Sequence, residues 1–92
     1  MIQSFADRET EQVFEGKHVR RYQQIAKIAL RKLVVLDNTA RLEDLKQPPG
    51  NRLEALKGDR AGQFSIRINA QYRICFRWSG DQPHEVGITD YH

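Results

Sequence analysis

The second half of this 92-residue chain contains a set of side chains that carry positive charge or can transfer protons. They are Lys57, Arg60, Arg67, Arg73, Arg77, Tyr91 and His92. Cleavage of RNA without a metal needs a base for the ribose 2′-OH, cations that stabilise the charge on the phosphorane, and an acid for the departing 5′ oxygen. Lysine, arginine, tyrosine and histidine can supply all three, and histidine titrates near neutral pH. RNA cleavage is therefore one hypothesis that these residue types support.

The same residues also have structural interpretations. Arg73 and Arg77 alternate along an expected strand, where most arginines simply face solvent, and Lys57 and Arg60 are compatible with ordinary loop charges. A Tyr-His pair at the end of a chain more often has no catalytic role. From the residue types alone, a nucleic-acid or partner-binding module without catalysis stays open.

Other kinds of site find little support in the spacing of the residues. His18, His84 and His92 do not have metal-ligand spacing, and one cysteine, Cys75, cannot complete a zinc site. The loop from Gly58 to Gly62 lacks the strand–loop–helix context of a nucleotide-binding loop, and no serine lies in a nucleophile elbow. We therefore expect neither a metal nor a cofactor.

Size and composition predict a single domain that spans residues 1–92. A single cysteine allows no internal disulfide, which favours a reducing compartment. We find no signal-peptide pattern at the start, and no stretch approaches the roughly 18 apolar residues of a membrane span. We therefore expect a cytoplasmic protein without membrane contact. The net charge of +3 and the isoelectric point of about 9.3 permit an anionic partner without requiring one.

The chain begins with a short strand-like alternation at residues 1–5, and helical periodicity follows. Asp7 is placed to cap a helix that runs to about Glu15. Gly16 is expected to end this helix, because glycine accepts the left-handed conformation common at helix ends.

A second and longer helix is predicted from about residue 20 to residue 36. Its apolar stripe consists of Ile25, Ile28, Ala29, Leu33 and Leu36, widened by Leu30 and Val34. Thr39 is expected to cap a short turn that carries Leu42 and Leu45. The sequence Pro-Pro-Gly at residues 48–50 is expected to form a loop.

The second half of the chain changes to the alternating pattern of strands. Apolar and polar residues alternate at 64–68, 72–78 and 86–88, with a tight turn at 69–71 and a short extended segment at 53–56. We therefore predict an α+β fold in which an N-terminal strand and two helices pack on one face of a mostly antiparallel sheet of about four strands. The residues expected on the opposite face are Arg67, Arg73 and Arg77.

The run from residue 49 to residue 76, PGNRLEALKGDRAGQFSIRINAQYRICF, resembles the signature half of the HigB branch of RelE-type toxins. The opening Met1–Phe5 and the ending Asp90-Tyr91-His92 match that branch too, so the resemblance spans essentially the whole chain. It implies a bacterial toxin with a fold like that of compact microbial ribonucleases. Such toxins enter the ribosomal A site, contact 16S rRNA there, and cleave mRNA without a metal. Their partner is a helix-turn-helix antitoxin.

The resemblance also implies roles for individual residues. Lys57 matches the family's loop lysine, which stabilises charge or transfers a proton, and Arg73 matches the strand arginine that faces the scissile phosphate. Among the last three residues, His92 is expected to act as general base or acid. Tyr91 is expected to stack on a base or relay a proton, and Asp90 to orient its neighbours.

One position departs from the family pattern. Some members carry a histidine three residues before the loop lysine, where this chain has Glu54. A glutamate can serve as the base, as carboxylates do in related small ribonucleases, or can be a surface residue. The candidate RNA-binding residues are Arg60, Arg67 and Arg77.

A second toxin class is the main alternative. The related ParE-type toxins share this architecture and act on DNA gyrase instead of RNA. They lack a terminal acid–base set, so Arg73 together with Tyr91 and His92 favours the ribonuclease hypothesis.

Overall fold

The computed structural model describes residues 1–90, and it confirms the α+β architecture. Its helices are α1 (Arg8–Phe14) and α2 (Ala26–Asn38), with 3-10 turns η1 (Arg20–Tyr22), η2 (Leu42–Lys46), η3 (Pro49–Asn51) and η4 (Gly58–Arg60). Its strands are β1 (Glu54–Ala55), β2 (Gln63–Arg67), β3 (Tyr72–Ser79) and β4 (Gln82–Asp90). The strands form one antiparallel sheet in the order β1-β2-β3-β4.

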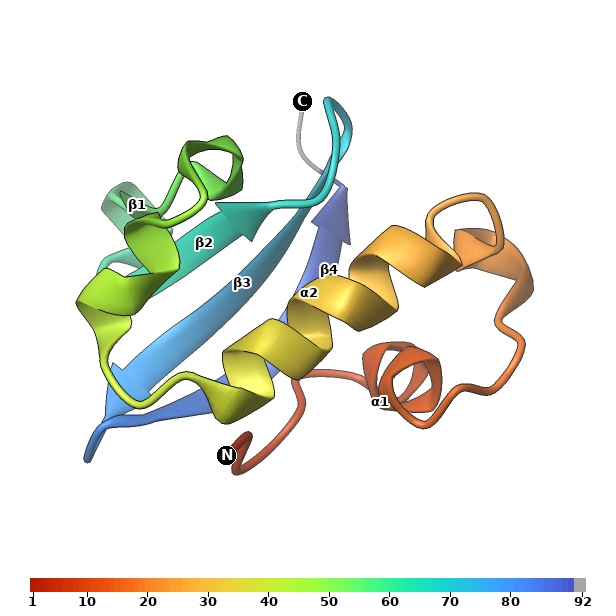
Figure 1. Ribbon diagram of the computed structural model, residues 1–92, viewed down its shortest axis with the longest axis horizontal. Coiled ribbons are helices and arrows are strands. Elements are labelled where there is room, and N and C mark those ends of the chain that lie inside the picture. The colour runs from red at the N-terminus through yellow and green to blue at the C-terminus, as the bar shows by residue number, and fades with distance from the viewer. Residues whose placement is uncertain (91–92) are drawn as a thin grey trace.

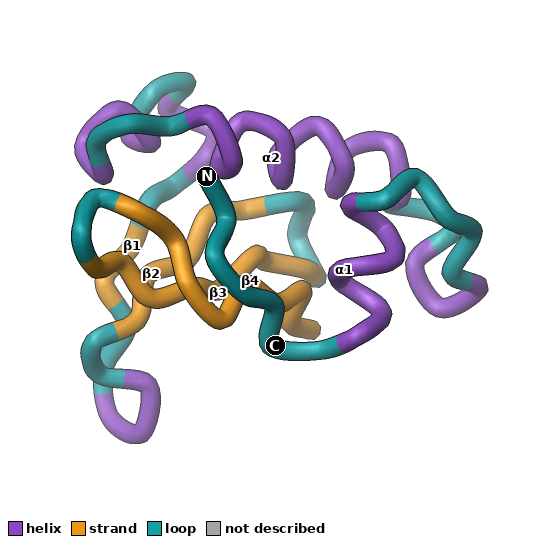
Figure 2. The backbone as a smooth tube through the Cα atoms, turned by 90° about the horizontal axis from the view of Figure 1, so that it is seen from below, coloured by secondary structure: helices purple, strands orange, loops and turns teal. Residues whose placement is uncertain are grey.

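The two helices cover one face of the sheet and leave the other face open. Helix α2 crosses the covered face and α1 lies beside it, near the edge formed by β4 (Figure 1). The loop that carries η4 extends on the other side of the sheet, away from α2 (Figure 2). The core between the layers contains fully buried side chains from both: Ala29, Leu33, Leu36, Ile66, Ile74, Phe76 and Val86.

The N-terminal segment protects the edge of the sheet at β4. The expected strand at residues 1–5 consists of one parallel bridge, between Phe5 and Val86. The backbone N–H of Val86 donates to the Ser4 carbonyl at 3.0 Å, and the N–H of Ile88 donates to the Thr10 hydroxyl at 2.9 Å. These bonds occupy edge groups that would otherwise be open to pairing with another chain.

Helix α1 begins and ends as the sequence predicts. The Asp7 carboxylate accepts a hydrogen bond from the Thr10 N–H at 2.7 Å and so caps the first turn. At the other end Gly16 adopts φ +80°, and the Lys17 N–H donates to the Gln12 carbonyl at 2.9 Å. This geometry is a Schellman motif, which satisfies carbonyls at the helix end.

The long helix starts later than predicted, because residues 19–25 form tighter turns. The Tyr22 N–H donates to the Val19 carbonyl and the Ile25 N–H to the Tyr22 carbonyl, both at 3.0 Å. Residues three apart lie on the same side of a 3-10 turn, and these three side chains are all buried. The α-helix therefore begins only at Ala26 and continues to Asn38.

The apolar stripe of α2 is narrower than predicted. Ala29, Leu33 and Leu36 are fully buried, whereas Ile28 is 41% exposed and Val34 is 44% exposed. Each exposed residue is next in sequence to a buried one and therefore lies about 100° around the helix from it. The prediction that Ile28 and Val34 belong to the core stripe is wrong for this geometric reason.

Two predictions for the following connection are also wrong. The Thr39 hydroxyl donates to the Val35 carbonyl at 2.6 Å and so belongs to the end of α2, while η2 begins after Arg41 without a side-chain cap. The Pro-Pro-Gly segment is a 3-10 turn instead of an irregular loop, because Pro49 suits its first position.

Candidate functional site

A row of residues crosses the open face of the sheet from one edge to the other. The paired positions are Glu54 on β1, Ser65 on β2, Cys75 on β3 and Gly87 on β4. Because side chains alternate between the two faces of a strand, positions two residues away lie on the same face. The next row therefore contains Arg67, Arg73 and Thr89. This open face holds the strand residues of the predicted site.

Arg73 lies on this face but is buried, with 7% of its surface exposed. Its Nε donates to the Ser65 Oγ at 2.7 Å, and its Nη2 donates to the Arg52 carbonyl at 2.7 Å. Its Nη1 lies 3.8 Å from the Glu54 Oε1. The guanidinium therefore extends along the sheet and ties the segment before β1 to β2. The expectation of a solvent-facing strand arginine is wrong, because neighbouring residues cover this long side chain.

Glu54, Lys57 and Arg60 line one hollow of about 430 Å³ beside β1. The Glu54 side chain is 50% exposed, so its carboxylate is open to solvent on one side and faces Arg73 on the other. Lys57 precedes η4 and Arg60 ends it, which places both cations around the same tight loop. The structure thus brings three predicted site residues together, with Arg73 directly behind Glu54.

A second hollow, of about 600 Å³, joins this group to the end of β4. Arg60 lines it at the loop end, and Asp90 lines it at the far end of the sheet, where Asp90 pairs with Tyr72. Asp90 accepts a hydrogen bond from the Gln71 Nε2 at 3.1 Å. Asp90 is therefore connected to the loop cations through the open face. The predicted site residues Tyr91 and His92 lie outside the described residues.

The basic residues of the open face differ in their pairing. The Nε of Arg77 lies 2.7 Å from the Glu85 Oε2, so this charge is neutralised locally. Among residues 1–90, no ion pair involves Lys57, Arg60 or Arg67. These three positive charges are therefore available to an anionic ligand, whereas Arg73 and Arg77 are each paired with a carboxylate.

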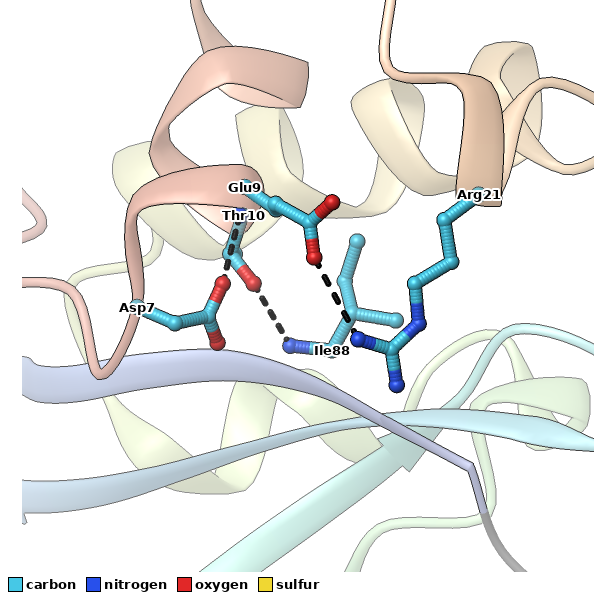
Figure 3. Close-up of polar contacts among 5 residues, drawn as sticks. All are labelled: Asp7, Glu9, Thr10, Arg21 and Ile88. Atoms are coloured by element: carbon cyan, nitrogen blue, oxygen red, sulfur yellow. Dashed lines mark hydrogen bonds and ion pairs between the residues drawn. The ribbon is translucent and has the colours of Figure 1, made fainter.

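Two residues from the helical half also reach the open face, and the sequence analysis missed both. Asp7 and Arg21 line the 600 Å³ hollow together with Ile88 (Figure 3). The Arg21 Nη1 lies 3.3 Å from the Glu9 Oε1, and its guanidinium carbon lies 5.3 Å from the centre of the Tyr22 ring. Tyr22 and Glu9 raise the pKa of Arg21, which keeps it charged. Two arginines followed by a tyrosine at residues 20–22 are the signal that could have found this residue.

The described residues hold no group of three or more histidine, cysteine, aspartate or glutamate side chains placed to bind a metal. Cys75 is buried beneath the 600 Å³ hollow, with 4% of its surface exposed. In the described part of the chain, we also find no helix with the length and apolar character to cross a membrane.

Solved structures with the same fold come from bacterial toxins. The chain matches a protein in the YoeB–YefM complex from Staphylococcus aureus with a TM-score of 0.58 and 18% identity, covering 100% of this chain and 98% of the other. It matches the YoeB/ParE toxin from Agrobacterium tumefaciens with a TM-score of 0.57 and 24% identity, covering 99% and 98% of the two chains. At these identities the likeness establishes the shared fold alone.

Comparisons of the amino-acid sequence with known proteins identify the family. Toxin HigB-1 of Vibrio cholerae is 41% identical over 80 residues, which cover 85% of this chain and 84% of that protein. Endoribonuclease HigB of Proteus vulgaris is 39% identical over 41 residues, or 45% of each chain. The family model for the RelE-like toxin HigB of type II toxin–antitoxin systems matches residues 3–92. The chain therefore belongs to the HigB-like family of RelE-like toxins of type II toxin–antitoxin systems.

Proposed function

We propose that this toxin is an endoribonuclease that cleaves mRNA in the ribosomal A site without a metal. The observation that carries the proposal is the Glu54 carboxylate, which faces the buried Arg73 at 3.8 Å and shares a hollow with Lys57 and Arg60. A carboxylate beside several cations is the combination that transfer of a ribose proton and stabilisation of a phosphorane require. The Proteus vulgaris relative with the name Endoribonuclease HigB supports the same reaction class.

In the proposed reaction Glu54 accepts the proton of the ribose 2′-OH. The freed 2′ oxygen attacks the adjacent phosphorus, the bond from phosphorus to the 5′ oxygen breaks, and a 2′,3′-cyclic phosphate forms. The departing 5′ oxygen takes a proton from a second group, and the family resemblance assigns that role to His92. Lys57 and Arg60 offset the negative charge that builds on the phosphate oxygens.

Arg73 is proposed as a positioning residue in this scheme. Its guanidinium is already bonded to Ser65 and to the Arg52 carbonyl, and its third contact is Glu54. An arginine that is buried and fixed by two hydrogen bonds gives the Glu54 carboxylate a stationary cationic neighbour on one side. Tyr91 and Asp90 are proposed to stack on or orient the substrate near His92, as the resemblance implies.

The ribosome is proposed to supply most of the substrate positioning. Within residues 1–90, the unpaired cations that we identify on the open face are Lys57, Arg60 and Arg67. With so few charges to hold RNA, the toxin benefits from a substrate that the ribosome already orients. We propose 16S rRNA as a contact and the cytoplasm as the place of action. The proposed inhibitor is a helix-turn-helix antitoxin, and a structural neighbour crystallised as a toxin–antitoxin complex is compatible with such a partner.

The sharpest test compares Glu54→Gln with Glu43→Gln. Glu43 is a matched control because it is also half-exposed, at 54%, and also pairs with an arginine, Arg41, at 2.7 Å. In a translation reaction with purified ribosomes and a defined mRNA, we expect Glu54→Gln to slow cleavage by about 100-fold to 10,000-fold. Glu43→Gln should cleave like the parent protein. The cut sites are mapped by primer extension.

The same assay distinguishes the proposal from its alternatives. Deletion of His92 and the substitution Lys57→Ala should each reduce cleavage and relieve growth inhibition, while thermal melting shows that the proteins remain folded. Intact messages together with DNA damage after brief induction would point to a gyrase poison. Growth inhibition that survives both changes would instead indicate a binding module without catalysis.

A further inference from the structure

The open face continues beyond the predicted catalytic group to Arg21. This residue extends from η1 toward β4, past Ile88 (Figure 3). Its side chain is 59% exposed, and it lines both the 600 Å³ hollow and a neighbouring hollow of about 250 Å³. Arg60 lines the loop end of the larger hollow, so a cation is present toward each end of one continuous groove.

The carboxylates that also line the larger hollow are already engaged. Asp7 caps α1 through the Thr10 N–H at 2.7 Å, and Glu85 pairs with Arg77 at 2.7 Å. Asp90 accepts from Gln71. Arg21 is held more loosely, by the exposed Glu9 at 3.3 Å. Exposed ion pairs of this kind are weak, so an anion that binds more strongly can displace the Glu9 carboxylate from Arg21.

The smaller hollow is lined by groups that suit a nucleobase. Besides Arg20 and Arg21, its lining includes four residues that carry side-chain amides: Gln23, Gln24, Asn69 and Gln71. Amide groups donate and accept hydrogen bonds in the pattern that base edges present. Gln71 also contacts Asp90, which lines the larger hollow at the end of β4, so the two hollows adjoin there.

We infer that Arg21 binds a backbone phosphate of single-stranded RNA at the end of the groove opposite Arg60, and that Glu9 competes with the RNA for Arg21. The inference rests on the proposed ribonuclease function and adds a substrate-binding residue from the helical half. It predicts effects in opposite directions, because removal of Arg21 weakens RNA binding and neutralisation of Glu9 strengthens it.

The test uses two exposed arginine–glutamate pairs with matched chemistry. The variants Arg21→Ala and Glu9→Gln change the groove pair, and Arg41→Ala and Glu43→Gln change a pair that lines neither hollow. The probe is a fluorescein-labelled 2′-O-methyl oligoribonucleotide of about 12 nucleotides, which cannot be cleaved and fits a short single-strand site. Fluorescence anisotropy gives the Kd of the full-length protein at several NaCl concentrations.

We expect Arg21→Ala to raise the Kd about fivefold and to reduce the slope of log K against log salt by about 0.7, the value for one phosphate contact. Glu9→Gln should lower the Kd about twofold, because the competing carboxylate is lost. The two control variants should leave both quantities unchanged. Thermal melting of each variant confirms that the chain is folded.

Several outcomes would overturn the inference. They are no binding of the oligonucleotide by the parent protein at low salt, equal effects of Arg21→Ala and Arg41→Ala, or weaker binding by Glu9→Gln. Cleavage of mRNA by the parent protein is measured separately, with purified ribosomes. If the parent protein does not cleave mRNA in that assay, the proposed function is wrong. The anisotropy measurements test separately whether Arg21 binds RNA.

Discussion

The two faces of the sheet bury their central residues in different ways. On the covered face Ile66, Ile74 and Phe76 are fully buried against α2, and their contacts are apolar. On the open face, with no helix of the described chain above them, Ser65 and Arg73 are also buried. Their burial comes from hydrogen bonds among neighbours and from a long side chain that lies flat on the strands.

The comparison shows how one face of a sheet can bury side chains without an apolar cover. Within residues 1–90, every buried side-chain nitrogen and oxygen has a hydrogen-bond partner. A satisfied polar network fixes orientation, but it is sensitive to the loss of a single partner. The covered face depends on packed area, while the open face depends on particular contacts, and the two should respond differently to substitution.

The largest effect on stability is expected from the covered face. Leu33→Ala removes a fully buried side chain at the centre of α2 and should lower the free energy of unfolding by about 3 kcal/mol, because it loses apolar burial and leaves a cavity. Urea denaturation followed by circular dichroism measures this change. A loss below about 1 kcal/mol would mean that the helix layer contributes less than its burial indicates.

An intermediate effect is expected from the open face. Ser65→Ala leaves the buried Arg73 Nε without its acceptor and should lower the free energy of unfolding by about 2 kcal/mol. The same substitution at the exposed Ser79 is the control and should have little effect. If the two serines behave alike, the polar network does not stabilise this face. Ser65→Ala should also slow RNA cleavage, since Arg73 is proposed to hold Glu54.

The smallest effect is expected on the outer side of α2. Val34→Ala changes a residue that is 44% exposed and should alter the free energy of unfolding by less than about 0.5 kcal/mol, because the small loss of burial is offset by the better helix propensity of alanine. Leu33→Ala, one residue away, provides the contrast in the same denaturation experiment. A large loss at Val34 would show that this side of the helix is packed after all.

Local patterns were sufficient for much of the fold. The caps of α1 at Asp7 and Gly16 were predictable because they depend on residues within one turn of the helix. The hairpin between β2 and β3 was predictable for a similar reason, since the Asn69 side chain accepts from the Gln71 N–H within the turn. The 3-10 turns before α2 were missed, because a spacing of three fits both kinds of helix over a short stretch.

The candidate site was only partly predictable. Glu54, Lys57 and Arg60 are close in sequence, so their shared hollow follows from one loop. Arg21 is separated from that loop by more than thirty residues, and only the packing of the helical half of the chain against the sheet brings it to the open face. The burial of Arg73 was also missed, because an alternating pattern identifies the face of a strand but not what covers it.

By itself the amino-acid sequence determined the order of helices and strands, the family, and the loop and strand that carry the charged residues, because these depend on periodicity and on short motifs. Only the tertiary structure decided which charges are paired and which are available. Arg73 pairs with Glu54, and Arg77 pairs with Glu85, across different strands of the sheet. The sequence pattern does not show how close two such side chains come in space, so it could not predict these pairs.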